Sequence, residues 1–277
     1  MLWTLIVVAI ILIVGVIWII GAREPVFSVK DGEPAWFVAV RTNTAPRFAS
    51  GVRITWSGAA DFALIGAEEG YWTRFYILAG GKAGESPLLP DGEEDALVAR
   101  ISMFTPPSFA LGMLRAMCKL GLLPKPKGPV MRNVDALEFR KDIVPTNESI
   151  AALLSRPQDY APTMVNFLAY APAAKYADSR VSTGAAAYRR YGAVAMKTVY
   201  RTGGALMFYG KVLEIMRPAK AGPSVGVWDD VAAMRYPNPS AILSMENVPE
   251  YHAALYHRDA GLARTIVIAT QPIPDAV

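Results

Sequence analysis

The sequence has little of the chemistry on which the most recognisable enzyme sites depend. It holds one cysteine, Cys118, and two histidines, His252 and His257, among 277 residues. A single cysteine excludes an intrachain disulfide, and the scarcity of both residue types argues against a zinc-type site. There is no Walker loop, no GxGxxG after a strand and no GxSxG. We therefore expect no metal and no cofactor.

The charge balance excludes a dedicated nucleic-acid binder. The net charge is +4, and residues 21–150 hold 15 basic and 15 acidic side chains, so the excess lies in residues 151–277. Proteins that bind nucleic acid usually concentrate basic residues in a denser patch. We expect no nucleic acid among the partners.

One feature that the sequence does have is a long apolar run at its beginning. Residues 1–22 carry no charged side chain, and only Thr4 and Gly15 interrupt the apolar residues from Leu2 to Ile20. A helix of this length spans about 30 Å, the thickness of the hydrocarbon core. A cleaved signal peptide would carry a basic start and a small-x-small exit, which are missing. The run predicts a single-pass transmembrane anchor that binds the lipid bilayer.

Basic residues follow the run and none precedes it. The positive-inside rule then places the N-terminus outside the inner (cytoplasmic) membrane and the later domains in the cytoplasm.

Residues 24–150 predict a mixed α+β domain. Strand-like runs separated by Gly- and Pro-rich breaks lie at Ala35–Arg41, Val52–Trp56, Trp72–Leu78 and Ala96–Met103. A helix is expected at Ser108–Leu122. One alternative reading makes this domain a degenerate second copy of the C-terminal fold, although no clear repeat is visible.

The predicted helix at Ser108–Leu122 allows two interpretations. Arg115 and Lys119 stand four residues apart on one face, and Lys125 and Lys127 follow. The plain interpretation is a core helix with solvated cations. The alternative is an interfacial helix whose basic residues bind the anionic surface of a membrane.

Residues 160–273 predict a ferredoxin-like domain with an antiparallel sheet. Their order is β-α-β-β-α-β, with strands at Met164–Tyr170, Ala205–Met216, Gly226–Tyr236 and Arg264–Gln271, and helices at 182–201 and 240–256. Such a unit leaves one face of its sheet uncovered. We favour a homodimer or a partner protein as the cover, and residues 24–150 are the alternative.

Four stretches carry a resemblance to a known family. Residues 164–168, 187–192, 228–237 and 249–262 resemble, in order, the uncharacterised family called domain of unknown function 1330. That family is similar to the dimeric α/β-barrel superfamily, which includes cofactor-independent monooxygenases and isomerases. The resemblance implies a cavity between sheet and helices that takes a hydrophobic small molecule.

Five residues are candidates for such a cavity. Asn166 would bind a carbonyl or enolate oxygen, His257 would move a proton and Arg258 would hold a carboxylate, while Tyr188 and Tyr191 would contact the ligand. Each also has a structural explanation. The tyrosines suit core packing, and cations near a helix C-terminus favour its dipole.

Two function classes follow from these observations. The first, which we favour, is a membrane-anchored binding or accessory subunit, in a larger membrane complex, with no catalytic site. The second is a small-molecule enzyme, monooxygenase- or isomerase-like, acting on a hydrophobic substrate between sheet and helices.

Overall fold

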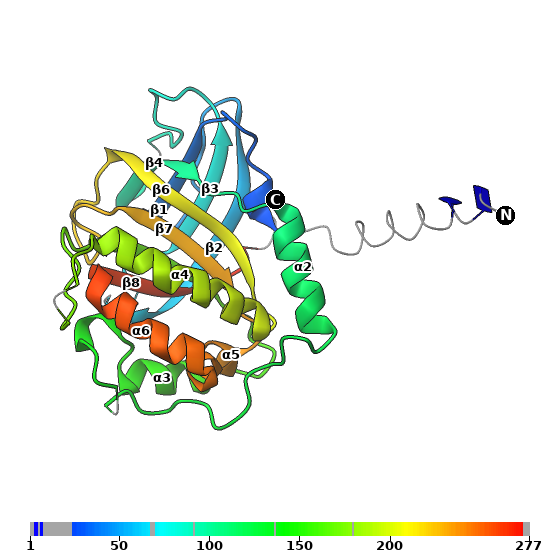
Figure 1. The fold of residues 1–277 in the computed structure, drawn as a ribbon. Coiled ribbons are helices and arrows are strands. Elements are labelled where there is room, and N and C mark those ends of the chain that lie inside the picture. Colours follow the sequence, from blue (N-terminus) through cyan, green and yellow to red (C-terminus); the bar gives the residue numbers. More distant parts are fainter. Residues whose placement is uncertain are drawn as a thin grey trace.

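Eight antiparallel strands close into one barrel (Figure 1). The computed structural model describes Trp3, Thr4, Ile6, Val7 and residues 24–66, 70–90, 92–135, 137–178 and 180–273. The strands follow the order β1-β3-β2-β8-β5-β7-β6-β4, and pairing of β4 with β1 closes the ring. They are β1 (Ala35–Arg41), β2 (Val52–Ile65), β3 (Arg74–Gly80), β4 (Asp95–Met103), β5 (Thr163–Tyr170), β6 (Ala205–Arg217), β7 (Asp230–Arg235) and β8 (Leu262–Gln271).

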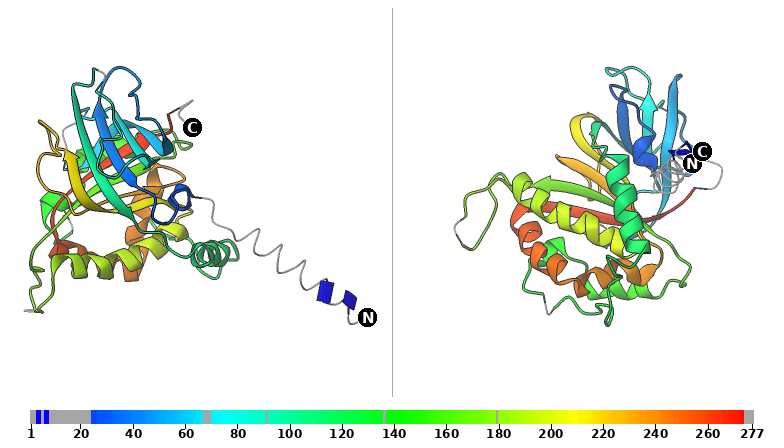
Figure 2. Two further views of the ribbon diagram at one scale, coloured as in Figure 1. Left: turned by 90° about the horizontal axis from the view of Figure 1, so that it is seen from above. Right: turned by 45° about the vertical axis from the view of Figure 1, so that its right-hand side comes forward.

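The helices lie mainly beside the C-terminal strands. They are α2 (Ser108–Lys119), α3 (Asn147–Leu154), α4 (Gly184–Arg201), α5 (Pro239–Leu243) and α6 (Pro249–Gly261), with short 3-10 turns η1 (Pro25–Phe27), η2 (Lys141–Ile143) and η3 (Ser244–Asn247). Helices α4 and α6 pack side by side on one side of the barrel, as Figures 1 and 2 show.

The two halves of the barrel share one strand order. The N-terminal half runs β4-β1-β3-β2 and the C-terminal half runs β8-β5-β7-β6. In the C-terminal half, helices connect β5 to β6 and β7 to β8. In the N-terminal half, the equivalent connections at 42–51 and 81–94 contain no helix among their described residues.

The sheets of the two halves are joined at both edges and form one closed antiparallel sheet. Strand β2 pairs with β8, with Ala63 opposite Ile268, and β4 pairs with β6, with Ser102 opposite Lys211. A ferredoxin-like sheet has two open edges, and edge strands pair wherever a matching edge is offered. The inner face of the C-terminal sheet also packs on strands β1–β4, the alternative cover named above, and a homodimer or partner protein stays a prediction.

Aromatic side chains fill the barrel interior. Phe37, Phe75, Phe167 and Phe208 come from four different strands, and each is at most 1% exposed. The ring of Phe37 lies 5.3 Å from that of Phe167 and 6.2 Å from that of Phe208. Burying rings of this size dominates core energetics.

Strand β1 is buried on both faces, and the sequence shows why. Its residues from Ala35 to Val40 are all buried. Alternate side chains point into the barrel with Phe37, or outward with Trp36, where the loop residues Phe48 and Leu88 help to cover them. A strand covered on both faces needs a continuous apolar run instead of an alternating one.

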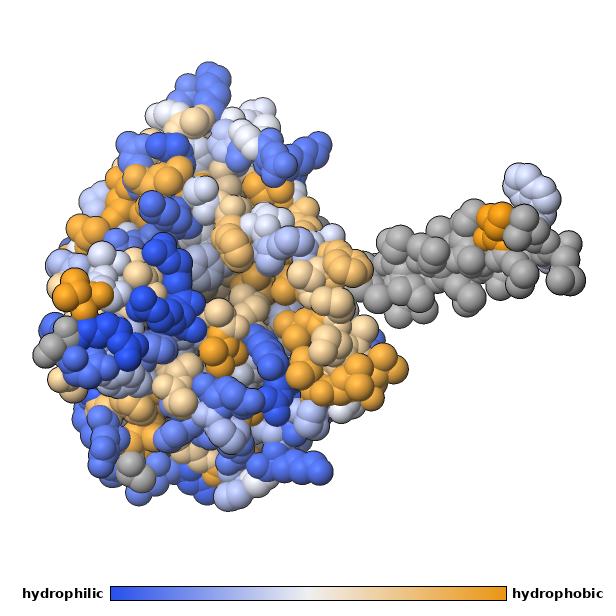
Figure 3. All heavy atoms as spheres, viewed as in Figure 1, coloured by the Kyte–Doolittle hydropathy of each residue, from blue (hydrophilic) through white to orange (hydrophobic). Residues whose placement is uncertain are grey.

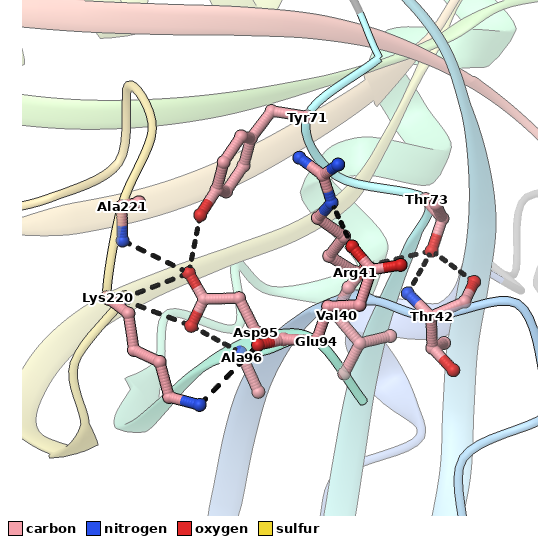
Figure 4. Close-up of polar contacts among 10 residues, drawn as sticks. All are labelled: Val40, Arg41, Thr42, Tyr71, Thr73, Glu94, Asp95, Ala96, Lys220 and Ala221. Atoms are coloured by element: carbon pink, nitrogen blue, oxygen red, sulfur yellow. Dashed lines mark hydrogen bonds and ion pairs between the residues drawn. The ribbon is translucent and has the colours of Figure 1, made fainter. Parts of the chain in front are cut away.

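Asp95 ties the two halves together in a polar cluster (Figure 4). Its carboxylate, 3% exposed, accepts hydrogen bonds from the Tyr71 hydroxyl at 2.6 Å and from the backbone N–H groups of Ala96, Lys220 and Ala221. Lys220 and Ala221 belong to the loop between β6 and β7. A side chain of the N-terminal half thus holds a loop of the C-terminal half.

The described residues do not contain the predicted transmembrane helix. No helix in the described ranges is both long and apolar enough to cross a membrane. The longest of them, α4 with 18 residues, carries Arg189, Arg190, Lys197 and Arg201. This finding overturns the expected architecture with an N-terminal transmembrane helix, and with it the single-pass inner-membrane localisation. Residues 1–22, on which the prediction was made, lie outside the described residues except for four.

Candidate functional site

A cavity of about 100 Å³ lies between the outer face of the C-terminal sheet and the helices. Its floor comes from outward-facing residues of β5, β7 and β8, and its roof from α4, α6, α5 and η3. The far end of β2 and the segment 131–145 complete the wall. Its lining is mostly apolar, and the polar exceptions are Asn166, Tyr188, Tyr191, Tyr236, Glu246, Tyr251 and Arg258.

Tyrosine hydroxyls form one polar side of the cavity. Tyr191 on α4 and Tyr251 on α6 bring their hydroxyl oxygens within 3.1 Å of each other, and both rings are buried. Burial raises the pKa of both phenols. The hydroxyls therefore stay protonated at neutral pH, and one of the two remains able to donate to a ligand.

Arg258 on α6 adds a positive charge to the cavity wall. It donates a hydrogen bond to the carbonyl oxygen of Ile143, and its guanidinium carbon lies 6.0 Å from the centre of the Tyr191 ring. Within the ranges that the structure describes, it has no carboxylate partner within 4.0 Å. A half-buried cation without a carboxylate partner favours an acceptor or an anion as its ligand.

Glu246 on η3 is the one carboxylate among the described lining residues. Its side chain is 16% exposed, and its Oε2 lies 3.1 Å from Nδ1 of the exposed His252. Burial raises the pKa of Glu246, and the neighbouring His252 and Arg258 offset part of that rise. The cavity therefore pairs a protonatable carboxyl with a fixed cation.

Asn166 lies in the cavity floor with its amide N–H groups already used. Its Nδ2 donates to the carbonyl oxygen of Met164 at 2.8 Å and to that of Ala232 at 3.5 Å. A ligand at this point would meet the amide oxygen of Asn166, which accepts hydrogen bonds. Asn166 therefore lines the cavity, and its expected bond to a carbonyl or enolate oxygen stays a prediction.

His257 lies apart from the cavity. Its Nδ1 is 2.7 Å from the hydroxyl oxygen of Tyr176, and the two rings meet edge to face. Burial, followed by the charges of Arg190 and Arg180, lowers its pKa. His257 is absent from the cavity lining, whereas its neighbour Arg258 is part of it. In the described residues, no three His, Cys, Asp or Glu side chains gather closely enough to hold a metal ion.

Tyr251 and Glu246 line the cavity but were not predicted from the sequence. Tyr251, Leu255 and Arg258 recur at i, i+4 and i+7, so they share one face of α6, and this spacing was a usable signal. Glu246 had no such signal. The predicted single helix over 240–256 is broken before Pro249, and the break leaves Glu246 in a separate 3-10 turn.

Helix α2 and the segment that follows it carry the other predicted surface residues. Lys119, Lys125 and Lys127 are exposed, whereas Arg115 pairs with the buried Glu24. Figure 3 shows apolar side chains gathered over α2, where Phe109, Met113, Leu120 and Leu122 are exposed. The assignment of the three lysines to a membrane surface stays a prediction, and the structure separates Arg115 from them.

Comparisons with known proteins give no functional assignment. No family model matches the chain, and no curated protein matches it. One similar solved structure is that of the methylated RPA0582 protein, with 31% identity and a TM-score of 0.43, covering 49% of this chain and 97% of that one. Another is the RPA0582 protein of unknown function from Rhodopseudomonas palustris, with 31% identity and a TM-score of 0.42, covering 47% and 96%.

Proposed function

We propose that this protein binds a small, mostly apolar molecule in the cavity between the C-terminal sheet and helices α4 and α6. The proposal rests on polar side chains that come together in one apolar cavity. Arg258 and the hydrogen-bonded pair of Tyr191 and Tyr251 line the same mostly apolar cavity. Apolar walls with a few convergent polar groups are typical of small-molecule sites. A volume of about 100 Å³ is somewhat below the roughly 150 Å³ of an apolar cavity that takes benzene, so the ligand is small and a substituted ring enters only with a shift of the lining side chains.

The test is to fill the cavity and to measure binding of a probe of matching size. In wild type, ¹⁹F NMR should show line broadening of 4-fluorobenzyl alcohol or of 4-fluorobenzoate on addition of protein. Ala195, which is buried and lines the cavity, is replaced by phenylalanine. The larger side chain occupies the ligand volume, so the broadening should disappear.

The matched control is Ala193→Phe, because Ala193 lies on the same helix but is exposed. It should bind both probes as wild type does. Circular dichroism checks that both variants stay folded. If wild-type protein broadens the ¹⁹F line of neither probe, the proposed function is contradicted.

A second candidate function is proton-transfer catalysis on the same ligand, as the isomerase-like alternative implies. Glu246 favours it, because a carboxyl whose pKa is raised in an apolar site suits general acid–base work. Turnover of an enolisable ligand that stops in Glu246→Gln, with binding retained, would support catalysis. The expectation of an accessory subunit in a larger assembly stays a prediction that native-gel separation tests.

A further inference from the structure

The charges around the cavity are set by one cation and one carboxyl. Arg258 and Glu246 both line it, and the structure shows no direct ion pair between them. The carboxyl of Glu246 bonds instead with His252, at 3.1 Å. The other titratable groups at the cavity are the neutral hydroxyls of Tyr188 and Tyr191 from α4, Tyr236 after β7, and Tyr251 from α6.

Because Glu246 is largely buried, a second negative charge in the cavity would change its protonation. The side chain of Glu246 is 16% exposed, so water screens its charge poorly. An anion bound to Arg258 would share the same apolar cavity. Two carboxylates in one such site cannot both stay ionised cheaply, and one of them takes up a proton.

His252 offers a route for that proton. Its side chain is 57% exposed, so one ring nitrogen contacts Glu246 while the ring stays open to water. An imidazole ring can accept a proton at one ring nitrogen and donate one from the other. A proton therefore reaches the carboxyl of Glu246 from solvent without passing through the apolar part of the cavity.

We propose that the ligand is a small apolar carboxylate held by Arg258, and that Glu246 takes up a proton through His252 when this anion binds. The inference rests on the proposed function and adds to it a ligand class and a link to pH. An O–H bond forms on the Glu246 carboxylate, and a water or buffer molecule in the solvent gives up the proton. One proton moves from solvent to the Glu246 carboxylate, and one anion enters from solvent.

Isothermal titration calorimetry with sodium 4-fluorobenzoate tests the proposal. Titrations at pH 7 in phosphate and in Tris, whose ionisation enthalpies differ, give the number of protons taken up for each anion bound. Wild type should take up a measurable fraction of one proton. The neutral 4-fluorobenzyl alcohol should bind more weakly and take up none.

Two variants separate the roles of the charged groups. Glu246→Gln should abolish proton uptake and should bind the anion more tightly than wild type at pH 8, because the competing charge is gone. Arg258→Met should lose the preference for 4-fluorobenzoate over the alcohol while still binding the alcohol. The control Glu250→Gln, at an exposed position, should behave as wild type.

The outcomes distinguish ligand binding in the cavity from proton uptake by Glu246. Binding of 4-fluorobenzoate without proton uptake would overturn the role of Glu246 and leave the cavity as a ligand site. Binding of the alcohol as tightly as the anion would overturn the ligand class. If neither probe binds wild type, the proposed function fails and this inference fails with it.

Discussion

Tyr71 donates its hydroxyl to the carboxylate of Asp95 across 2.6 Å, and this bond fastens the loop after β2 to the first residue of β4. Burial and the bond to Asp95 raise the pKa of Tyr71 to about 12. The same carboxylate holds the loop between β6 and β7. One side chain thus connects three segments that are distant in sequence.

Replacing Asp95 with asparagine should destabilise the protein at pH 7 by about 2 kcal/mol, because buried hydrogen bonds to a charged group are lost or weakened. Urea denaturation measures the free energy of unfolding. The control is Glu94→Gln, since the neighbouring pair of Glu94 and Arg41 is exposed and contributes less than about 1 kcal/mol. An equal cost for both variants would contradict the special role of Asp95.

The cost of Asp95→Asn should depend on pH. Burial opposes ionisation of Asp95, but hydrogen bonds from Tyr71 and three backbone N–H groups outweigh it and lower the pKa. A lowered pKa in the folded state gives stability that is present above the ordinary value of 3.8 and is lost as the pH falls through the lowered pKa. The difference between wild type and variant should therefore shrink in acid, and a constant difference from pH 7 to pH 3 would refute this linkage.

Glu246→Gln should stabilise the protein without ligand at neutral and higher pH. Burial raises the pKa of Glu246 in the folded state. The stability that the protonated carboxyl contributes is therefore fully present below the ordinary pKa of 4.5 and is lost as the pH rises through the raised pKa. The Glu246→Gln variant has no carboxyl at this position and does not lose this stability. Its melting temperature should exceed that of wild type at pH 8 by on the order of a few degrees and match it near pH 4. Glu250→Gln, which is exposed, should show no such crossover.

Gly184→Ala should destabilise the contact between α4 and α6. A Cβ at Gly184 would lie 2.2 Å from the carbonyl oxygen of Ala171 and 2.5 Å from that of Gly261, so the backbone would have to move. We expect a cost of about 1–3 kcal/mol, as for overpacking. Gly192→Ala on the same helix is the control, because its Cβ would meet nothing within 4 Å. There the substitution should be neutral or slightly stabilising.

The variants His257→Ala and Arg258→Met should differ in their affinity for 4-fluorobenzoate. His257 contacts Tyr176 outside the cavity, so its removal should leave binding of 4-fluorobenzoate unchanged. Arg258 lines the cavity, so its removal should weaken binding at least about tenfold, the equivalent of one charge-assisted hydrogen bond. Calorimetry of both variants checks this, and a comparable loss in His257→Ala would place the site elsewhere.

Local sequence patterns predicted where most strands and helices lie. Residues 35–41 were predicted as a strand and form β1 over that range, because a continuous apolar run is a local signal. Tyr188 and Tyr191 were named from the sequence as ligand contacts, and both residues line the cavity. Such signals depend on near neighbours in the chain.

The way these elements pair and pack depends on contacts between residues that are distant in the chain. Strands β4 and β6 pair although Val98 and its partner Arg217 are more than a hundred residues apart, and no local pattern encodes which edge meets which. The break before Pro249 then aims Glu246 at the cavity, and the turn of α6 sends His257 and Arg258 to different faces. Side chains of consecutive helix residues point about 100° apart, so His257 and Arg258 cannot both face one cavity. The packing of α6 against the sheet turns Arg258 toward the cavity.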